Sequence, residues 1–358
     1  MKIGIITFHR ANNYGAVLQA YALQKALIQK GFQVKIIDYV SYYLKYPFGK
    51  ANWEAKGIIA QLLTLFGEIS RMPRRKAFDD FRKLLVLTEP VTKKELPDIE
   101  KDFDLFLAGS DQVWNYKITN QDGAYLLDFV QDTNKKGSYA ASFGFTDVDP
   151  TLIVWYQKLL VSFRYLNVRE KSSLPLLRKI IDCSGDVVVD PTLLLLKQDW
   201  MNLAILPSNK GPYILTYQVG MDKELIEYAK FLSEKTGFKL YSIPFPQGGI
   251  VKSHFIMDAG PREWLGWIAN AQYVITDSFH GVALSIALEK EFFVHHSTRG
   301  AVLSSRIDDL LSELNITDHY ISFKDECFPK KIDYDSVSKR LHTIREYSIN
   351  KILEMCGD

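Results

Sequence analysis

Residues 2–40 of the chain read KIGIITFHRANNYGAVLQAYALQKALIQKGFQVKIIDYV, with two short apolar runs around one long helical run. The runs at 2–7 and 33–40 have the length and branched side chains of strands, and the run at 16–31 has the length of a helix that ends at Gly31. Strand, helix and strand in this order make a βαβ unit, which joins parallel strands. The stretch therefore predicts an α/β fold with a parallel sheet.

The alternation of strands and helices continues in two series. The first adds strands at 103–108, 137–141, 165–168 and 186–189, and the second has strands at 213–219, 238–245, 273–276 and 291–296 with helices at 222–236, 262–271, 281–290 and 304–314. Pro, Ser, Asn and Gly cluster at 207–211, which places a boundary between 197 and 212. We expect two Rossmann-like domains, at 1–200 and 205–332, facing across a ligand-binding cleft, with a helix at 333–358 that packs back on the first domain.

Composition excludes several classes of protein. The chain has 358 residues, 47% of them hydrophobic, and a formal net charge of +2, so no overall field favours nucleic acid. Three scattered cysteines, Cys183, Cys327 and Cys356, give neither a zinc motif nor a disulfide framework and fit a reducing cytoplasm. The first ten residues read as a strand and not as a signal peptide, and no apolar run reaches the length of a transmembrane helix.

An insertion near 41–83 differs in composition from its surroundings. Aromatic residues at 42, 43, 46, 48 and 53 precede a short apolar run, and basic residues follow at 71, 74, 75, 76, 82 and 83. Two interpretations stay open. The segment is either a pair of helices in the first domain that covers a sheet face, or a contact to a membrane surface or a lipid-pyrophosphate acceptor.

Residues 273–288, YVITDSFHGVALSIAL, read as a buried strand, a short loop and a buried helix from about Gly281. Such a turn lies at the carboxyl edge of a parallel sheet, where ligands bind. The start of the helix favours a phosphate or carboxylate, and His280 can exchange a proton near neutral pH. The alternative is a structural histidine with Asp277 or Ser278 as the N-cap.

Two loops in the first domain also place polar residues after a strand. The loop ANNYG at 11–15 lacks the GxGxxG spacing of dinucleotide sites, and its asparagines either cap the helix or bond a sugar hydroxyl. The loop GSDQVWN at 109–115 carries Asp111, either a general base for an alcohol or a turn cap. Trp114 in the same loop either stacks on a sugar ring or packs.

Three arginines follow predicted strands: Arg169, Arg299 and Arg306. An arginine side chain can donate two parallel hydrogen bonds to a carboxylate or phosphate. The alternative for Arg169 is a salt bridge at the surface or between domains. For Arg306 it is a pairing with Asp309.

Five motifs together resemble the polysaccharide pyruvyl transferase family. They are NYGAVLQAYAL at 13–23, GSDQVWN at 109–115, VRE at 168–170, DPT at 190–192 and TDSFHG at 276–281. Their order and spacing cover nearly the whole chain. Other branches of the family carry an arginine at the position of Ser278, so in this chain another residue takes over the anion contact of that arginine.

The resemblance implies two Rossmann-like domains similar to those of GT-B glycosyltransferases. It also implies transfer of pyruvate from phosphoenolpyruvate onto two hydroxyls of one sugar as a ketal, with release of phosphate. The sugar would belong to a surface polysaccharide, such as a capsule or exopolysaccharide, or to its lipid-linked precursor. Phosphoenolpyruvate is then a co-substrate, and neither a metal nor a cofactor is expected.

For this reaction we predict His280 as general acid and Asp111 as the group that orients or deprotonates the acceptor. The donor would be held by Arg169, Ser278, Gly281, Arg306 and Arg299, and the acceptor by Asn12, Asn13, Tyr14, Gly15, Trp114 and Asn115.

Two other functions fit the same architecture. One is a glycosyltransferase that uses a nucleotide sugar, and the other is a non-catalytic glycan-binding protein, since a fold does not fix a function. We expect the chain in the cytoplasm, with the inner face of the membrane as the alternative if the 41–83 insertion makes a peripheral contact. The sequence leaves the acceptor sugar and the oligomeric state open.

Overall fold

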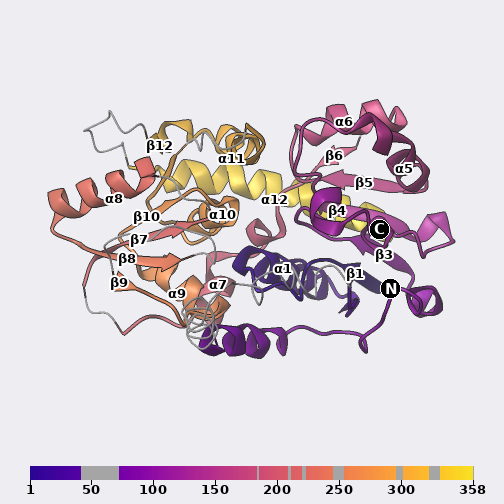
Figure 1. Ribbon diagram of the computed structural model, residues 1–358, viewed down its shortest axis with the longest axis horizontal. Coiled ribbons are helices and arrows are strands. Elements are labelled where there is room, and N and C mark those ends of the chain that lie inside the picture. Colours follow the sequence, from indigo (N-terminus) through magenta and orange to yellow (C-terminus); the bar gives the residue numbers. More distant parts are fainter. Residues whose placement is uncertain are drawn as a thin grey trace, which may run out of the picture. The chain divides into compact units, whose positions relative to one another are not determined.

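The computed structural model describes residues 1–41, 72–183, 185–208, 211–219, 223–244, 254–295, 301–321 and 331–357. The chain divides into two compact units (Figure 1). Unit 1 comprises Met1–Pro47, Arg82–Leu194 and Arg340–Asp358, and unit 2 comprises Phe48–Phe81 and Leu195–Lys339. Among the described helices, none is long and apolar enough to cross a bilayer.

Unit 1 is built on a six-stranded parallel sheet with the order β2-β1-β3-β4-β5-β6. Its strands are β1 Lys2–Ile6, β2 Gln33–Ile36, β3 Leu105–Ala108, β4 Lys136–Ala141, β5 Tyr165–Val168 and β6 Asp186–Val187. Its α-helices are α1 Tyr14–Gln29, α4 Tyr116–Thr119, α5 Pro150–Leu160 and α6 Ser173–Ile181, and most of α12 Tyr334–Cys356 also belongs to it. Short 3₁₀ helices lie at η1 Leu96–Asp102, η2 Gly123–Leu126, η3 Thr133–Lys135 and η4 Pro191–Leu193.

Helices cover both faces of this sheet. Leu166 and Val168 of β5 pack with the apolar residues of α5 and α6 in one core cluster. On the other face, Asn167 donates a hydrogen bond to Sδ of Met355 in α12, and a Cβ added at Gly137 would lie 3.2 Å from the same sulfur. Because both faces are covered, β3 and β4 are buried along their whole length, as is usual for parallel sheets.

Unit 2 is built on a second parallel sheet with the order β12-β11-β10-β7-β8-β9, which is the strand order of Rossmann folds. The strands are β7 Tyr213–Gln218, β8 Lys239–Pro244, β9 His254–Phe255, β10 Tyr273–Thr276, β11 Phe292–His295 and β12 Tyr320–Ile321. The helices are α7 Lys197–Leu203, α8 Lys223–Thr236, α9 Pro261–Asn270, α10 Phe279–Ala287 and α11 Ala301–Leu314, with η5 Thr317–His319.

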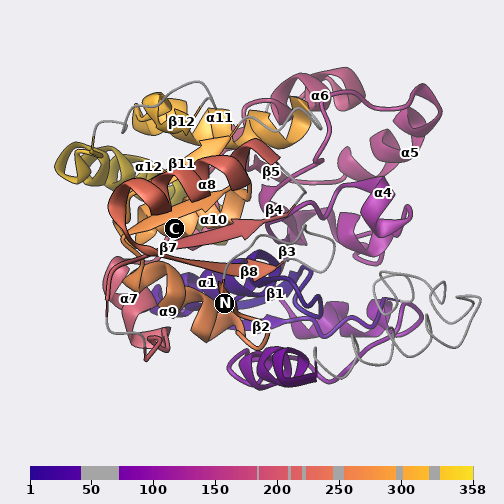
Figure 2. The ribbon, with the colours of Figure 1, turned by 60° about the vertical axis from the view of Figure 1, so that its left-hand side comes forward.

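The sheet of unit 2 is also covered on both faces, by α8 and by α9 (Figures 1 and 2). Ile214, Ile275 and Phe293 pack with the apolar residues of α8. On the opposite face, the hydroxyl of Tyr213 donates to the carbonyl of Trp267 in α9, at 2.7 Å. The two sheets are therefore of the doubly wound kind that the alternating pattern predicts.

Local chemistry explains where the elements begin. Helix α1 begins at Tyr14, two residues before the expected start, because Oδ1 of Asn13 accepts from the backbone N–H of Ala16 and caps it. Helix α10 likewise begins at Phe279, because Ser278 caps it. Strands β9 and β12 were not expected, since two residues are too few for a periodic signal.

The insertion expected at 41–83 lies mostly outside the described residues, since the structure describes only 41 and 72–83 of it. Residues 72–82 are helical, and contacts group the chain up to Phe81 with unit 2 and not with the first domain. The physical reason is close packing, because a Cβ added at Gly260 would lie 2.4 Å from that of Ala77. Arg74 is buried and lies over the ring of Phe78, so this basic residue points inward.

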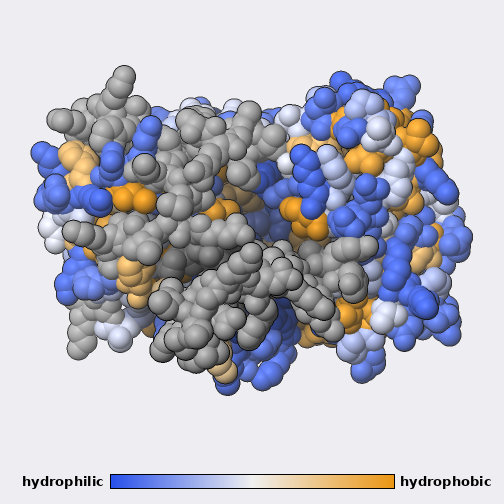
Figure 3. Space-filling model, in the orientation of Figure 1, coloured by the Kyte–Doolittle hydropathy of each residue, from blue (hydrophilic) through white to orange (hydrophobic). Residues whose placement is uncertain are grey.

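On the face shown in Figure 3, hydrophilic residues cover most of the described surface and hydrophobic residues are scattered between them. Among the described large hydrophobic residues of unit 1, Val154 in α5 and Val161 directly after it are the most exposed, at 72% and 68%. Scattered apolar residues of this kind are normal on a protein surface. The alternative of a peripheral membrane contact stays a prediction about the insertion.

The anchoring of α12 can be tested at Ser348. Its buried hydroxyl donates to the carbonyl of Ile344 and accepts from the N–H of Val189, at 2.9 Å. Ser348→Ala leaves that N–H without its partner, and we expect a loss of about 1–3 kcal/mol in the free energy of unfolding measured with denaturant. Ser338→Ala, at an exposed position of the same helix, should stay within about 0.5 kcal/mol of the wild type. Equal effects of the two changes would contradict the anchoring role.

Candidate functional site

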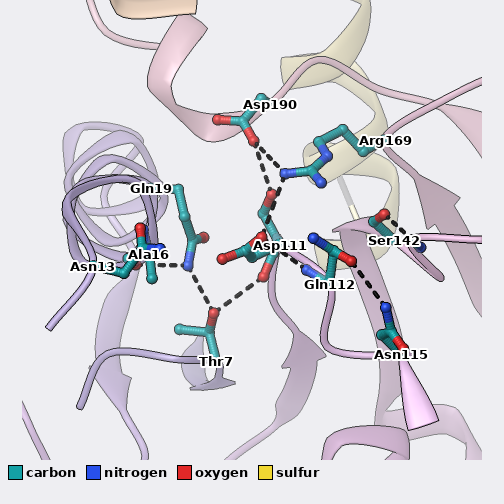
Figure 4. A network of polar contacts seen from close by, with 12 residues as sticks. Thr7, Asn13, Ala16, Gln19, Asp111, Gln112, Asn115, Ser142, Arg169 and Asp190 are labelled. Atoms are coloured by element: carbon teal, nitrogen blue, oxygen red, sulfur yellow. Dashed lines mark hydrogen bonds and ion pairs between the residues drawn. The ribbon is translucent and has the colours of Figure 1, made fainter. Parts of the chain in front are cut away.

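Polar residues gather in unit 1 at the carboxyl ends of β1 and β3. From β1 the chain passes through α1 to β2 on one side of β1, while β3 lies on its other side. The carboxyl ends of β1 and β3 therefore form a topological switch point. Ligands of open α/β sheets bind at such points. Figure 4 shows the network that fills this edge, with residues from the start of α1 and from the segments after β1, β3, β4, β5 and β6.

Asp111 occupies this edge in an unusual backbone conformation. Its φ is +75°, in the left-handed region that few residues other than glycine adopt. Three hydrogen bonds fix it: Oδ1 accepts from the N–H of Gln112 at 2.9 Å, and its carbonyl accepts from the N–H groups of Val113 at 2.8 Å and Ser142 at 3.0 Å. The side chain is 14% exposed. A strained residue that its surroundings hold in place is typical of functional sites.

Arg169 lies at the end of β5 and is buried among three carboxylates. Its Nη1 lies 3.1 Å from Oδ2 of Asp190 and 3.8 Å from Oδ1 of Asp111, and its Nε lies 3.4 Å from Oε2 of Glu170. Burial opposes the charge on Arg169, but Glu170, Asp190 and Asp111 outweigh it and raise its pKa further above the usual value. The guanidinium is therefore a fixed cation that carboxylates of its own unit engage.

Asp190 and Glu170 belong to the same cluster, and they were not among the predicted site residues. Oδ2 of Asp190 also accepts from the hydroxyl of Ser110 at 3.2 Å, and its Oδ1 caps η4 through Thr192. Oε1 of Glu170 accepts from the hydroxyls of Ser142 at 2.7 Å and Ser173 at 2.8 Å. The sequence signal that could have identified them is their position after two predicted strands, which places both carboxylates at the same edge of the sheet.

A second cluster that was not predicted lies at the ends of β1 and β2. Nε2 of His9 lies 2.8 Å from Oδ1 of Asp38, and Nδ1 of the same ring lies 3.2 Å from the carbonyl of Thr7. Arg10 donates twice to Asp38, at 2.7 Å each. Burial would raise the pKa of Asp38, but the hydrogen bonds and charges of His9 and Arg10 outweigh it and hold this pKa below its usual value.

The residues predicted to contact the acceptor have mixed surroundings. Asn12 is exposed and its Oδ1 accepts from Arg82 at 3.1 Å, and Asn13 is half-buried and caps α1. The others are buried in the structure: Tyr14, Gly15, Trp114 and Asn115.

Two of these buried residues have clear structural roles. Asn115 caps α4 and donates to Gln112 at 2.9 Å. Trp114 is 1% exposed and its ring packs on Phe143 and Phe163, with centroids 5.1 and 5.8 Å apart. Trp114 thus adopts the packing alternative and does not present a face on which a sugar could stack.

The predicted residues of unit 2 gather at its own switch point, between β7 and β10. Oγ of Ser278 caps α10 through the N–H of Gly281 at 3.3 Å, which is the expected alternative to a direct ligand contact. The N–H of Ser278 donates to the hydroxyl of Thr276 at 3.0 Å. A Cβ added at Gly281 would lie 2.5 Å from that hydroxyl, so glycine is needed for the close approach of helix and strand.

His280 lies in the first turn of α10 and is 9% exposed. Its ring meets that of Phe279 edge-on at 5.3 Å, and the guanidinium of Arg306 lies 6.0 Å from the centre of the Phe279 ring. Phe279 thus lies beside both His280 and Arg306, while the donor site itself stays a prediction. Oδ1 of Asp277 accepts from the N–H of Val219, and Arg299 lies outside the described residues.

The predicted site residues thus form two groups. Asp111 and Arg169 lie together in unit 1, and Ser278, His280, Gly281 and Arg306 lie together in unit 2. The part of the chain that the structure describes contains no group of three or more His, Cys, Asp or Glu side chains that could hold a metal ion.

Comparison with known proteins gives both a family and a fold. A family model for polysaccharide pyruvyl transferases matches residues 13–294, which confirms the resemblance carried by the five motifs. No curated protein matches the chain.

Among solved structures, UDP-GlcNAc 2-epimerase of Neisseria meningitidis, bound to UDP-GlcNAc, shares 11% identity over 99% of this chain and 100% of its own, with a TM-score of 0.50. The epimerase of Methanocaldococcus jannaschii shares 13% over 96% and 92%, with a TM-score of 0.50. At this identity the likeness shows the fold alone. Together with the two parallel sheets it confirms the expected GT-B-like fold class.

The cluster around Asp38 predicts a pH dependence of stability. The pKa of Asp38 is lower in the folded protein than in the unfolded chain, so its ionisation stabilises the fold above about pH 4, and this contribution is lost as the pH falls through the folded value. We expect Asp38→Asn to lower Tm clearly at pH 7, because it removes the carboxylate that pairs with Arg10 and hydrogen-bonds the ring of His9. The difference from the wild type should shrink below about pH 4 in thermal scans.

Asp147→Asn is the control, because this carboxylate pairs with Lys179 but its side chain is 79% exposed. Its effect on Tm should be small at every pH. A difference between Asp38→Asn and the wild type that stays constant from pH 7 to pH 3 would contradict the role assigned to Asp38.

Proposed function

The chain belongs to the polysaccharide pyruvyl transferase family, and on this premise we propose that it transfers pyruvate from phosphoenolpyruvate onto two hydroxyls of one sugar. The product is a pyruvate ketal, and phosphate is released. The match over residues 13–294 carries the proposal, since it includes Asp111 and Arg169 of unit 1 and the start of α10, with His280, in unit 2. The acceptor would be a sugar of a surface polysaccharide or of its lipid-linked precursor.

The donor carries a carboxylate and a phosphate, so it requires hydrogen-bond donors and positive charge. We assign it to the start of α10, where the helix dipole is positive, together with Arg306 and with Arg299 outside the described residues. Gly281 serves this site by close packing, because its N–H already donates to the cap at Ser278. Other branches of the family carry an arginine at the position of Ser278, and we propose that Arg306 makes the anion contact of that arginine in this chain.

The reaction also needs a proton for the methylene carbon and a base for the attacking hydroxyl. We propose that His280 delivers the proton to the methylene carbon while Asp111 takes the proton of the first hydroxyl, whose oxygen bonds to the central carbon. The second hydroxyl then bonds to the same carbon as the bond to phosphate breaks, and its proton leaves with the phosphate. The proton that Asp111 has gained then returns through solvent to His280, so the protons and bonds balance over one turnover without a further reactant.

Arg169 takes a different role from the donor contact that its sequence position suggested. Its guanidinium is held by Asp190, Glu170 and Asp111, so we propose that it neutralises these carboxylates and fixes Asp111. We place the reaction on the cytoplasmic side, where phosphoenolpyruvate is produced. Phosphoenolpyruvate itself would be a co-substrate and no further cofactor takes part.

The donor can be identified without knowing the acceptor. A ligand present at about 100 times its Kd adds about 2.7 kcal/mol to the free energy of unfolding. We expect phosphoenolpyruvate to raise Tm in thermal scans, whereas UDP-sugars and GDP-sugars leave it unchanged. A rise with a nucleotide sugar and none with phosphoenolpyruvate would instead identify a glycosyltransferase. Acceptors would then be screened by phosphate release from phosphoenolpyruvate.

The role of His280 predicts a large kinetic effect. Replacing it by alanine removes the acid that protonates the methylene carbon, and we expect a loss of about 10²- to 10⁴-fold in the rate of phosphate release. His342→Ala, at an exposed position of α12, is the matched control and should keep the wild-type rate. Normal turnover by a folded His280→Ala variant would remove His280 from the mechanism.

A further inference from the structure

Gln19 is a buried polar residue at the switch point of unit 1 that the proposed function does not use. It lies on the second turn of α1 and is 0% exposed. Its carboxamide hydrogen-bonds the hydroxyl of Thr7, at the end of β1. Thr7 in turn donates to the carbonyl of Ser110, the residue before Asp111. A single hydroxyl therefore connects Gln19 to the loop that carries Asp111.

The orientation of the Gln19 carboxamide follows from its partners. Its Nε2 lies 2.8 Å from Oγ1 of Thr7 and 2.9 Å from the carbonyl of Ala16. The carbonyl can only accept, and the hydroxyl of Thr7 has already donated its proton to Ser110. Both partners thus require a donor, and only the NH₂ end of Gln19 supplies one. A flipped carboxamide would lose both hydrogen bonds.

This orientation leaves Oε1 of Gln19 as an acceptor without a donor among the described residues. A buried acceptor in this state costs about 1–3 kcal/mol, so a protein that keeps one has a use for it. Figure 4 shows the carboxamide of Gln19 and the carboxylate of Asp111 pointing toward one another, from α1 and from the loop after β3. An ionised Asp111 is also an acceptor and has no proton to offer Gln19.

We propose that Gln19 is a positioning residue for the proton that Asp111 takes up, with Oε1 of Gln19 accepting a hydrogen bond from the protonated carboxyl of Asp111. This inference rests on the proposed function, because Asp111 gains its proton from the acceptor hydroxyl. In the step, the O–H bond of the sugar breaks, the sugar oxygen bonds to the central carbon of the donor, and the proton forms a new O–H bond on Asp111. That new O–H group is the donor that Oε1 lacks before the reaction.

The charges around Asp111 define what Gln19 adds. Nη1 of Arg169 lies 3.8 Å from Oδ1 of Asp111, while Asp190 and Glu170 compete for the same guanidinium. The N–H of Gln112 also donates to Oδ1 of Asp111. These groups meet the carboxylate as donors, whereas Gln19 offers an acceptor, which only the neutral acid can use. A general base must hold the proton that it takes from the sugar hydroxyl, and Gln19 stabilises Asp111 while the carboxyl carries that proton.

A double-mutant cycle tests the contact without any substrate. Asp111→Asn places a permanent N–H donor where the protonated acid would carry its O–H, and Gln19→Met removes the acceptor while keeping the length of the side chain. We expect Gln19→Met to lower the Tm of Asp111→Asn by about 2 °C more than it lowers the Tm of the wild type. The lost bonds to Thr7 and Ala16 cancel, since they are the same in both backgrounds.

Gln24→Met is the matched control. Gln24 is a buried glutamine of the same helix whose two ends are both paired, with Nε2 donating to the carbonyls of Val34 and Val86 and Oε1 accepting from the N–H of Val86. Its effect on Tm should be equal in the wild type and in Asp111→Asn. If Gln19→Met also gives equal shifts in the two backgrounds, the proposed contact is refuted, whatever the protein's activity.

The pH profile then tests the catalytic meaning of the contact. With the acceptor found by phosphate release, Gln19→Met should lower kcat about tenfold and move the acid limb of kcat/KM by about half a pH unit to one unit toward lower pH, because Asp111 loses support for its proton. Gln24→Met should leave that limb in place. If the acid limb of kcat/KM stays in place in Gln19→Met, Gln19 does not position the proton of Asp111. If the wild type releases no phosphate with any acceptor, the proposed function is contradicted, and the double-mutant cycle alone then decides whether Gln19 and Asp111 make the contact.

Discussion

One buried cation organises the carboxyl edge of the unit 1 sheet. Arg169, at the end of β5, pairs with carboxylates that follow β3, β5 and β6. Each carboxylate also accepts hydrogen bonds from hydroxyls or backbone N–H groups at the ends of neighbouring strands, so the cluster ties the loops together. Burying these charges costs much desolvation energy and adds little net stability. What the cluster provides is a fixed arrangement, which a site for proton transfer requires.

The two switch points carry opposite chemistry. In unit 2 the start of α10 and Arg306 offer positive charge and N–H donors, as an anionic donor substrate needs. In unit 1 the carboxylate of Asp111 and the carboxamide of Gln19 point toward one another beside the paired cation Arg169, and their oxygens suit the hydroxyl substrate that we propose. Since each Rossmann-like sheet has its own switch point, a chain with two such sheets can bind two dissimilar substrates without changing its fold.

The fold was predictable because it depends on periodicity, and the βαβ pattern of residues 2–40 determines it. The positions of the sheet edges were also predictable, which is why the sequence could place Asp111, Arg169 and His280 at the ends of strands. The partners of these residues were not predictable, since they depend on three-dimensional neighbours. His9 and Asp38 are separated by a whole helix, and Asp190 is 21 residues from Arg169. Trp114 failed as a stacking residue because burial by Phe143 and Phe163 leaves no trace in the local sequence.

Helix α12 gives the chain an order of assembly. Ser348 and Met355 contact Val189 and Asn167, although everything else in unit 1 precedes residue 195. During synthesis, the part of the first sheet that α12 covers, around β4 and β5, therefore stays open until residues 340–356 have been made, after the whole of unit 2. The N-terminal half of such a chain is the last to be completed, and in the interval its apolar face is open to chaperones or to wrong partners.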